Sequence, residues 1–285
     1  MGHGRHDHGG DERDDVEEHD LGLAHDLPVL LSRRRALLAL SGGLGAVLVG
    51  CGSDGGTTTA ARTPATTTGT GTAATTAATA AVPEETAGPF PADGSNGPNV
   101  LAESGVVRRD ITRSFGDASG VATGVPTTVE LRLIDVAGGG GPLRGAAVYL
   151  WHCDALGRYS LYDDETASEN YLRGVQVSDD EGRLSFRTVF PGAYPGRWPH
   201  AHFEVYRDEA AAVAGSAKLR TSQLAFPQDA CERVYATDGY DGSAANLAAT
   251  PLDGDGVFAD GYAGQLATAT GDVRGGLAVR LNVGI

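Results

Sequence analysis

Apolar and polar residues alternate at a spacing of two in several short segments of this 285-residue chain. The clearest segments are residues 129–133, 183–187 and 277–283. In a β-strand this spacing places every second side chain on the same face. Glycine, proline and aspartate separate the segments, as is typical of turns. The pattern predicts an all-β fold, a β-sandwich with little helix; the one helix that we expect is short and alanine-rich, within residues 209–217.

One extended run carries two histidines. His200 and His202 would point to one face of a strand, whereas the apolar Ala201 and Phe203 would point to the core. Imidazole nitrogen is a ligand for iron, copper, zinc and nickel. A His-x-His pair is also compatible with two histidines that simply form hydrogen bonds in a strand, so the pair alone leaves the question open.

Two tyrosines strengthen the metal-site interpretation. Tyr194 lies in a glycine- and proline-rich turn just before His200, and Tyr159 lies further upstream. Phenolate is a hard anionic donor that suits ferric iron, and a bound cation favours the phenolate form. Two phenolates and two imidazoles form a donor set of charge minus two, which favours ferric over ferrous iron.

The order and spacing of these residues resemble the intradiol ring-cleavage dioxygenases. The motifs that carry the resemblance are Trp151-His152-Cys153-Asp154 with Gly157 and Tyr159, then Pro191-Gly192 with Tyr194, then Arg197 with His200 and His202. The resemblance extends from Glu84 to the C-terminus and implies the β-sandwich core of that family. The helical N-terminal dimerisation domain of catechol 1,2-dioxygenases has no counterpart in the sequence, where a Thr/Ala-rich segment stands instead.

The resemblance implies one non-haem ferric ion per chain. Its ligands would be Tyr159, Tyr194, His200 and His202. The implied reaction cleaves a catechol-type ring between its two hydroxylated carbons with dioxygen, which gives a cis,cis-muconate-type product.

Three residues take catalytic roles under the same resemblance. Arg197 would stabilise negative charge on the substrate ring. Gln223 would form hydrogen bonds at the iron site. Tyr194 would leave the metal when the substrate binds and then accept a proton. Ala193 and Ala201 depart from the usual residues of the family, and Ala193 leaves the identity of the catechol open.

Two other functions remain as alternatives. A β-sandwich of this kind could have lost catalysis and serve as a binding module for aromatic or cell-wall ligands, since a fold alone does not establish a function. A copper or zinc protein that uses His200 and His202 is the other, although zinc usually recruits cysteine, histidine or carboxylate rather than tyrosine.

The N-terminal part has the pattern of an export signal. Arg33, Arg34 and Arg35 precede an apolar run that ends at Cys51. The run is too short to span a bilayer comfortably, and it resembles a twin-arginine lipoprotein signal over residues 1–50 with lipidation at Cys51. Residues 51–83 are rich in threonine and alanine and predict a flexible tether, followed by the catalytic domain at 84–285. We therefore expect an exported protein that is lipid-anchored on the extracytoplasmic face of the cell membrane.

Charge and cysteine content limit the partners. The net charge is −15 and the pI is about 4.8, with no basic stripe in the folded part, which argues against nucleic acid as a partner. Cys153 and Cys231 can form a disulfide outside the cytoplasm or remain buried thiols. The expected small-molecule partners are a catechol and dioxygen, and membrane contact is expected only through the anchor. A homo-oligomer is left open.

Overall fold

The computed structural model describes residues 80–285. The predicted signal at residues 1–50, the lipidation site Cys51 and most of the predicted tether therefore lie outside the described residues. Val82 is already buried and donates its backbone N–H to Gly284 O, so contacts with the folded domain begin slightly before residue 84. The described elements, in chain order, are β1 (Pro126–Asp135), β2 (Gly141–Pro142), β3 (Ala147–Trp151), β4 (Arg173–Val177), β5 (Arg183–Val189), β6 (His200–Tyr206), α2 (Glu209–Val213), β7 (Lys218–Ala225), α3 (Gln228–Tyr235), α4 (Ser243–Ala249), η2 (Leu252–Gly254), β8 (Thr268–Asp272) and β9 (Gly276–Gly284).

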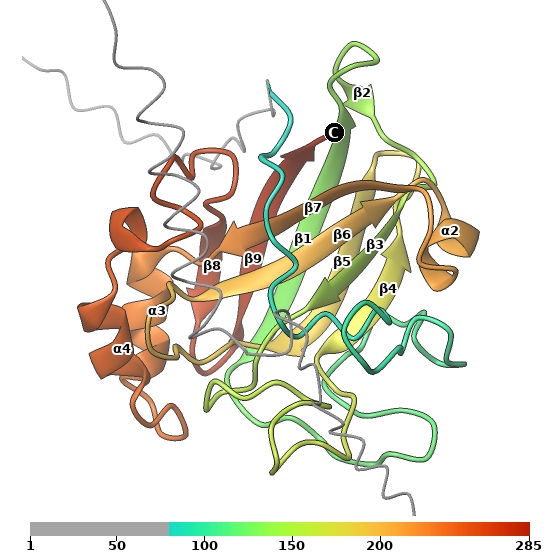
Figure 1. The fold of residues 1–285 in the computed structure, drawn as a ribbon. Coiled ribbons are helices and arrows are strands. Elements are labelled where there is room, and N and C mark those ends of the chain that lie inside the picture. Colours follow the sequence, from blue (N-terminus) through green and yellow to red (C-terminus); the bar gives the residue numbers. More distant parts are fainter. Residues whose placement is uncertain (1–79) are drawn as a thin grey trace, which may run out of the picture.

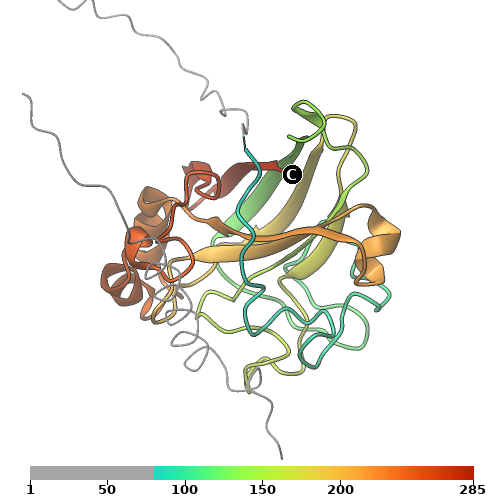
Figure 2. The same ribbon diagram turned by 45° about the horizontal axis from the view of Figure 1, so that its top comes forward.

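Two sheets face each other (Figures 1 and 2). The larger sheet has the order β8, β9, β1, and both β5 and β2 pair with the remaining edge of β1. Only the β1–β9 pair is parallel among the described strand pairs within this sheet. The smaller sheet is antiparallel with the order β4, β3, β6, β7. The predicted all-β sandwich is confirmed.

The core between the sheets is built from the alternating apolar residues. β1 contributes Val129, Leu131 and Leu133, and every second residue of β9 is buried in the same way. From the smaller sheet, Phe203 and Val205 of β6 belong to the same cluster. His200 and His202 therefore lie on the opposite face of β6, as the alternation predicts.

That opposite face is also covered by protein. Every residue of β3 and β6 is buried. A second apolar cluster lies over the outer face of the smaller sheet and includes Tyr149 and Trp151 of β3, Tyr159 from the loop after β3, and Phe90 from the N-terminal segment. The candidate metal ligands therefore lie in a layer between a sheet and the loops above it that is largely shielded from solvent, where electrostatic interactions are strong.

The helices are short and lie outside the sheets. α2 falls within the window predicted from the sequence, and the Asp208 side chain caps it by accepting a hydrogen bond from Ala211 N. α3, α4 and η2, between β7 and β8, were not predicted. α3 does bury Ala230, Cys231, Val234 and Tyr235 at helical spacing, a signal that the sequence analysis missed, whereas α4 buries only Ser243 and η2 is three residues long. Figure 1 shows α3 and α4 near the start of β6 and α2 near its end. No helix within residues 80–285 is long and apolar enough to cross a membrane.

The possible disulfide between Cys153 and Cys231 is not formed. Both residues are free buried thiols in the structure. Cys153 belongs to the cluster over the outer face of the smaller sheet, whereas Cys231 belongs to the core between the sheets. Each Sγ donates to a backbone carbonyl, that of Gly192 or Phe226, and burial raises the pKa of both thiols. They act as small apolar residues of the interior.

Candidate metal centre

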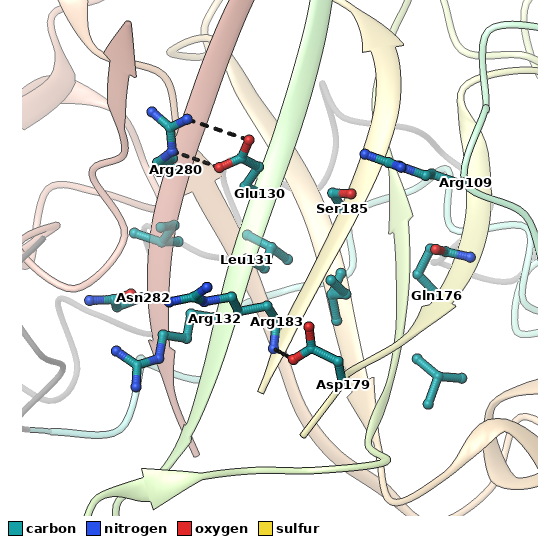
Figure 3. A pocket seen from close by; sticks show the side chains of 13 residues that line it. Arg109, Glu130, Leu131, Arg132, Gln176, Asp179, Arg183, Ser185, Arg280 and Asn282 are labelled. Atoms are coloured by element: carbon teal, nitrogen blue, oxygen red, sulfur yellow. Dashed lines mark hydrogen bonds and ion pairs between the residues drawn. The ribbon is translucent and has the colours of Figure 1, made fainter. Parts of the chain in front are cut away.

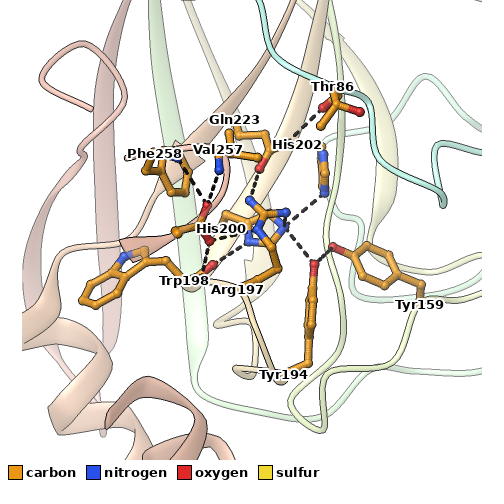
Figure 4. A network of polar contacts seen from close by, with 11 residues as sticks. Thr86, Tyr159, Tyr194, Arg197, Trp198, His200, His202, Gln223, Val257 and Phe258 are labelled. Atoms are coloured by element: carbon orange, nitrogen blue, oxygen red, sulfur yellow. Dashed lines mark hydrogen bonds and ion pairs between the residues drawn. The ribbon is translucent and has the colours of Figure 1, made fainter. Parts of the chain in front are cut away.

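Three parts of the chain supply the four predicted ligands. His200 and His202 begin β6, Tyr159 lies in the loop after β3, and Tyr194 lies in the loop between β5 and β6. The start of β6 is fixed on both sides, because Trp151 of β3 and Gln223 of β7 are the register partners of His202. In the view of Figure 4, the Tyr194 ring reaches this point from below and the Tyr159 ring reaches it from the right.

The four donor atoms converge. Tyr159 Oη lies 3.5 Å from Tyr194 Oη, and Tyr194 Oη lies 3.1 Å from His200 Nε2. His200 Nε2 lies 3.1 Å from His202 Nε2. His200 Nδ1 lies 2.5 Å from the Trp198 carbonyl oxygen and must donate to it, so Nε2 carries the lone pair that faces the other donors. This is how a histidine is oriented when its second nitrogen binds a metal.

Packing fixes the ring of His202. The ring stacks on Trp151 with a centroid distance of 5.0 Å and an interplanar angle of 7°. Its Nδ1 is buried and has no hydrogen-bond partner within residues 80–285, so the ring is held by this stacking and by the contact of its Nε2 with His200 Nε2. On another side lies Gly88, where a Cβ atom would come within 3.1 Å of His202 Cε1.

Burial sets the protonation of the donors. Desolvation lowers the pKa of His200 and of His202 well below 6.5, and the positive charge of Arg197 lowers both further. Desolvation raises the pKa of Tyr194 to about 12 and that of Tyr159 well above 10. At neutral pH the set is thus two neutral imidazoles and two phenols, and a bound cation would be needed to form phenolates.

The residues fit ferric iron better than copper or zinc. Two oxygen donors that become anionic beside a cation and two imidazole nitrogens match a hard trivalent ion. A copper or zinc site on His200 and His202 would recruit a further histidine, cysteine or carboxylate. Within residues 80–285 no group of three such side chains is close enough to hold a metal.

Arg197 and Gln223 both lie beside these donors. The Arg197 side chain is buried, with Nη1 3.4 Å from His200 Nε2 and Nη2 donating to Gln223 Oε1 at 2.6 Å. Gln223 Nε2 in turn donates to the Thr86 carbonyl oxygen at 3.0 Å. The structure thus brings all six predicted site residues together, and the N-terminal segment at Thr86 closes one wall.

Asp255 is a site residue that the sequence did not reveal. Its carboxylate forms a buried ion pair with Arg197, with an Nε–Oδ2 distance of 2.8 Å. In the sequence it stands in Asp253-Gly254-Asp255-Gly256, which looks like an ordinary turn. A buried arginine usually needs an acidic partner, so a predicted site arginine implies that such an acid exists. Nothing in the sequence shows which acid is the partner.

Comparisons with known proteins point to one family. A family model described as dioxygenase matches residues 96–231, a span that contains the four donors, Arg197 and Gln223. The chain is 34% identical over 136 residues to the protocatechuate 3,4-dioxygenase beta chain of Burkholderia cepacia, which covers 44% of this chain and 54% of that protein. It is 37% identical over 75 residues to catechol 1,2-dioxygenase of Candida albicans, which covers 26% of this chain and 24% of that protein.

A solved structure agrees with these sequence relatives. The intradiol ring-cleavage dioxygenase from Tetranychus urticae superposes with a TM-score of 0.52 at 25% identity, over 64% of this chain and 88% of that one. The matched regions span only about a quarter and about half of the lengths of the two curated relatives.

Proposed function

Because the chain belongs to the intradiol ring-cleavage dioxygenase family, we propose that it is a non-haem ferric dioxygenase with one iron per chain. Its substrates would be a catechol and dioxygen, and its product would be of the cis,cis-muconate type. The observation that carries the proposal is the convergence of Tyr159, Tyr194, His200 and His202 on one point, with neighbouring donor atoms 3.1 to 3.5 Å apart.

The protein supplies a dry, pre-arranged set of donors. His200 and His202 present unprotonated nitrogens because their pKa values are lowered by burial. When bound, ferric iron would supply the positive charge that holds both oxygens of a catechol and activates the ring toward dioxygen. Trp151, stacked against His202, excludes water from one side of the site.

Tyr194 is suited to hold a substrate proton. It is half-buried, whereas Tyr159 is fully buried, so Tyr194 is the more accessible of the two phenols. Its pKa is raised to about 12 mainly by desolvation, so its phenolate would be a strong base if it were not balanced by the cation. A catechol must lose its protons to bind as a dianion, and Tyr194 can take one of them.

An optical spectrum of the iron-loaded protein tests this function. We expect a broad visible band from phenolate-bound ferric iron, and a shift to longer wavelength when a catechol is added without oxygen. Admission of oxygen should then consume one dioxygen per catechol and release a muconate-type product. A protein that stays colourless after iron reconstitution would instead support the alternative of a catalytically inactive binding module.

We also propose that the chain is exported and anchored by a lipid at Cys51, on the sequence pattern of residues 33–51. Cys51→Ser should release the protein from the membrane fraction of cells that export it. Cys231→Ser, a change at a buried thiol of the domain, is the matched control and should leave membrane association unchanged. Equal membrane association of Cys51→Ser and the wild type would refute lipidation.

A further inference from the structure

Asp255 is a fully buried carboxylate whose two oxygens are both engaged. Oδ2 accepts from Arg197 Nε at 2.8 Å and from Trp198 N at 2.7 Å. Oδ1 accepts from Val257 N at 2.7 Å and from Phe258 N at 3.2 Å. Backbone donors thus fix the carboxylate in the turn after η2, and its only charged partner among the described residues is Arg197.

The guanidinium of Arg197 is held along two of its edges. Nε is bound to Asp255 and Nη2 is bound to Gln223, which fixes the plane of the group. Phe258 lies beside it, with the guanidinium carbon 5.9 Å from the ring centroid. The remaining nitrogen, Nη1, lies 3.4 Å from His200 Nε2 and so faces the donor cluster (Figure 4).

We propose that Asp255 is the positioning residue for Arg197, and that it aims Nη1 at the substrate bound beside His200. The proposal rests on the proposed dioxygenase function. A rigidly placed donor stabilises developing negative charge better than a mobile one, because no reorganisation is needed during the reaction. Buried arginine without a fixed counter-ion would lose both its orientation and its balance of charge.

Asp255 lies outside the part of the chain that the family model matches. The family model ends at residue 231, whereas Asp255 lies in the segment between β7 and β8. The same segment packs Val257 and Phe258 against Trp198, the neighbour of Arg197. A part of the chain outside the family match therefore completes a site whose ligands all lie inside it.

Asp255→Asn tests the role with little change of shape. The amide has no negative charge. Its N–H₂ group, which is a donor, would face either the backbone N–H donors or the Arg197 guanidinium, so one of these contacts is lost. Since the four iron ligands are untouched, we expect unchanged iron content and an unchanged visible band. Catechol affinity without oxygen should change by less than about threefold, while turnover per bound iron should fall by about a hundredfold. The control Asp253→Asn changes an exposed acid of η2 and should behave as the wild type.

A double-mutant cycle separates positioning from a general structural role. If Asp255 acts only through Arg197, the pair Arg197→Ala and Asp255→Asn should turn over as slowly as Arg197→Ala alone, within about threefold. The proposal would be overturned if the double variant lost turnover by the product of the two single losses. It would also be overturned if Asp255→Asn had the same turnover per iron as the wild type.

A measurement on the iron-free protein keeps this test independent of activity. The Arg197 Nε–H signal, assigned by its loss in Arg197→Lys, should exchange slowly with solvent in the wild type and at least tenfold faster in Asp255→Asn. Equal exchange rates of the Arg197 Nε–H in both proteins would refute the positioning of Arg197 by Asp255. If the Nε–H exchanges slowly in the wild type but the wild type cleaves no ring, the dioxygenase function is refuted. The positioning of Arg197 by Asp255 would still stand.

Discussion

At the residue scale, the candidate metal centre is a set of donors whose protonation depends on whether a cation is bound. Burial holds the imidazoles of His200 and His202 neutral and makes ionisation of Tyr159 costly. A trivalent cation would offset that cost, so ligand binding and phenol ionisation are coupled. Loss of any one donor should therefore cost more binding free energy for iron than the loss of one ordinary hydrogen bond would cost.

Tyr159→Phe and His200→Ala should each abolish iron retention or ring cleavage. Each removes one donor atom from the point where the four converge. Iron per chain and the visible band measure the effect. Tyr171→Phe is the matched control, because Tyr171 is also buried but lies in a different apolar cluster. Wild-type turnover in either ligand variant would show that the site lies elsewhere.

Gly88→Ala should disturb His202 from the side of the N-terminal segment. The residue has φ +70°, and a Cβ atom would lie 3.1 Å from His202 Cε1. The backbone strain alone should cost about 1 kcal/mol of unfolding free energy. Gly116→Ala is the control: it carries similar strain at φ +65°, but its Cβ would have no atom within 4 Å. The difference between the two variants therefore measures the effect of the contact with His202.

Urea denaturation and iron content of the two glycine variants should differ. We expect Gly88→Ala to be the less stable of the two and to bind iron more weakly, because the ring of His202 must move. Equal stability and equal iron content in both variants would show that the N-terminal segment shifts to accommodate the Cβ atom and that His202 does not move.

At the element scale, the outer face of the larger sheet carries a concentration of arginine in an otherwise acidic protein. A cleft of about 590 Å³ on this face is lined by residues of β1, β4, β5 and β9 and by Arg109 and Asp179. Figure 3 shows the side chains that line it. Glu130 forms an ion pair with Arg280 across β1 and β9. Arg132 and Arg183 are direct register partners on β1 and β5, so two like charges face each other.

Replacement of one member of this like-charge pair should stabilise the sheet. Opposed like charges are unfavourable, and threonine suits a strand, so Arg183→Thr should raise the unfolding free energy by up to about 0.5 kcal/mol. The gain should shrink in high salt. Arg187→Thr, on the same strand, loses a weak ion pair with Asp110 instead and should give no gain. Chemical denaturation at two salt concentrations measures both, and a loss of stability in Arg183→Thr would contradict the repulsion.

At the scale of the whole molecule, a buried histidine links the layers. His152 follows β3; its Nδ1 donates to the Cys153 carbonyl, and its Nε2 accepts from Thr188 Oγ1 of β5, each at 2.7 Å. Desolvation, the largest cause, lowers its pKa to about 4. In its neutral form it joins β3 of the smaller sheet to β5 of the larger one, and its protonation would place a positive charge in the desolvated interior.

Acid should therefore weaken the fold through His152. Its folded pKa lies below its unfolded value near 6.5, so the unfolded chain binds more protons between about pH 6.5 and pH 4. Stability should fall as the pH drops through this window, by at most about 3 kcal/mol from this group. Urea denaturation of iron-free protein at pH 7 and pH 4.5 measures the loss. His152→Gln should show a smaller pH dependence than the wild type, and an equal one would refute this role.

The sequence alone was sufficient for the sandwich and for the face on which the histidines lie. Strand periodicity is local, so residues 129–133 alternate in burial, and Ala201, Phe203 and Val205 of the His200 run face the core between the sheets. The ordered Tyr159, Tyr194, His200 and His202 motif, through its resemblance to a known family, predicted four donors, and the structure places their donor atoms next to one another.

The tertiary structure alone decided the arrangement around these ligands. It showed that Asp255 balances Arg197, that Gly88 lies against His202, and that Cys153 and Cys231 remain apart as free thiols. It also placed α3 and α4 between β7 and β8. These features depend on which distant segments share a buried volume, and hydrophobic packing selects those neighbours without regard to their separation in the chain.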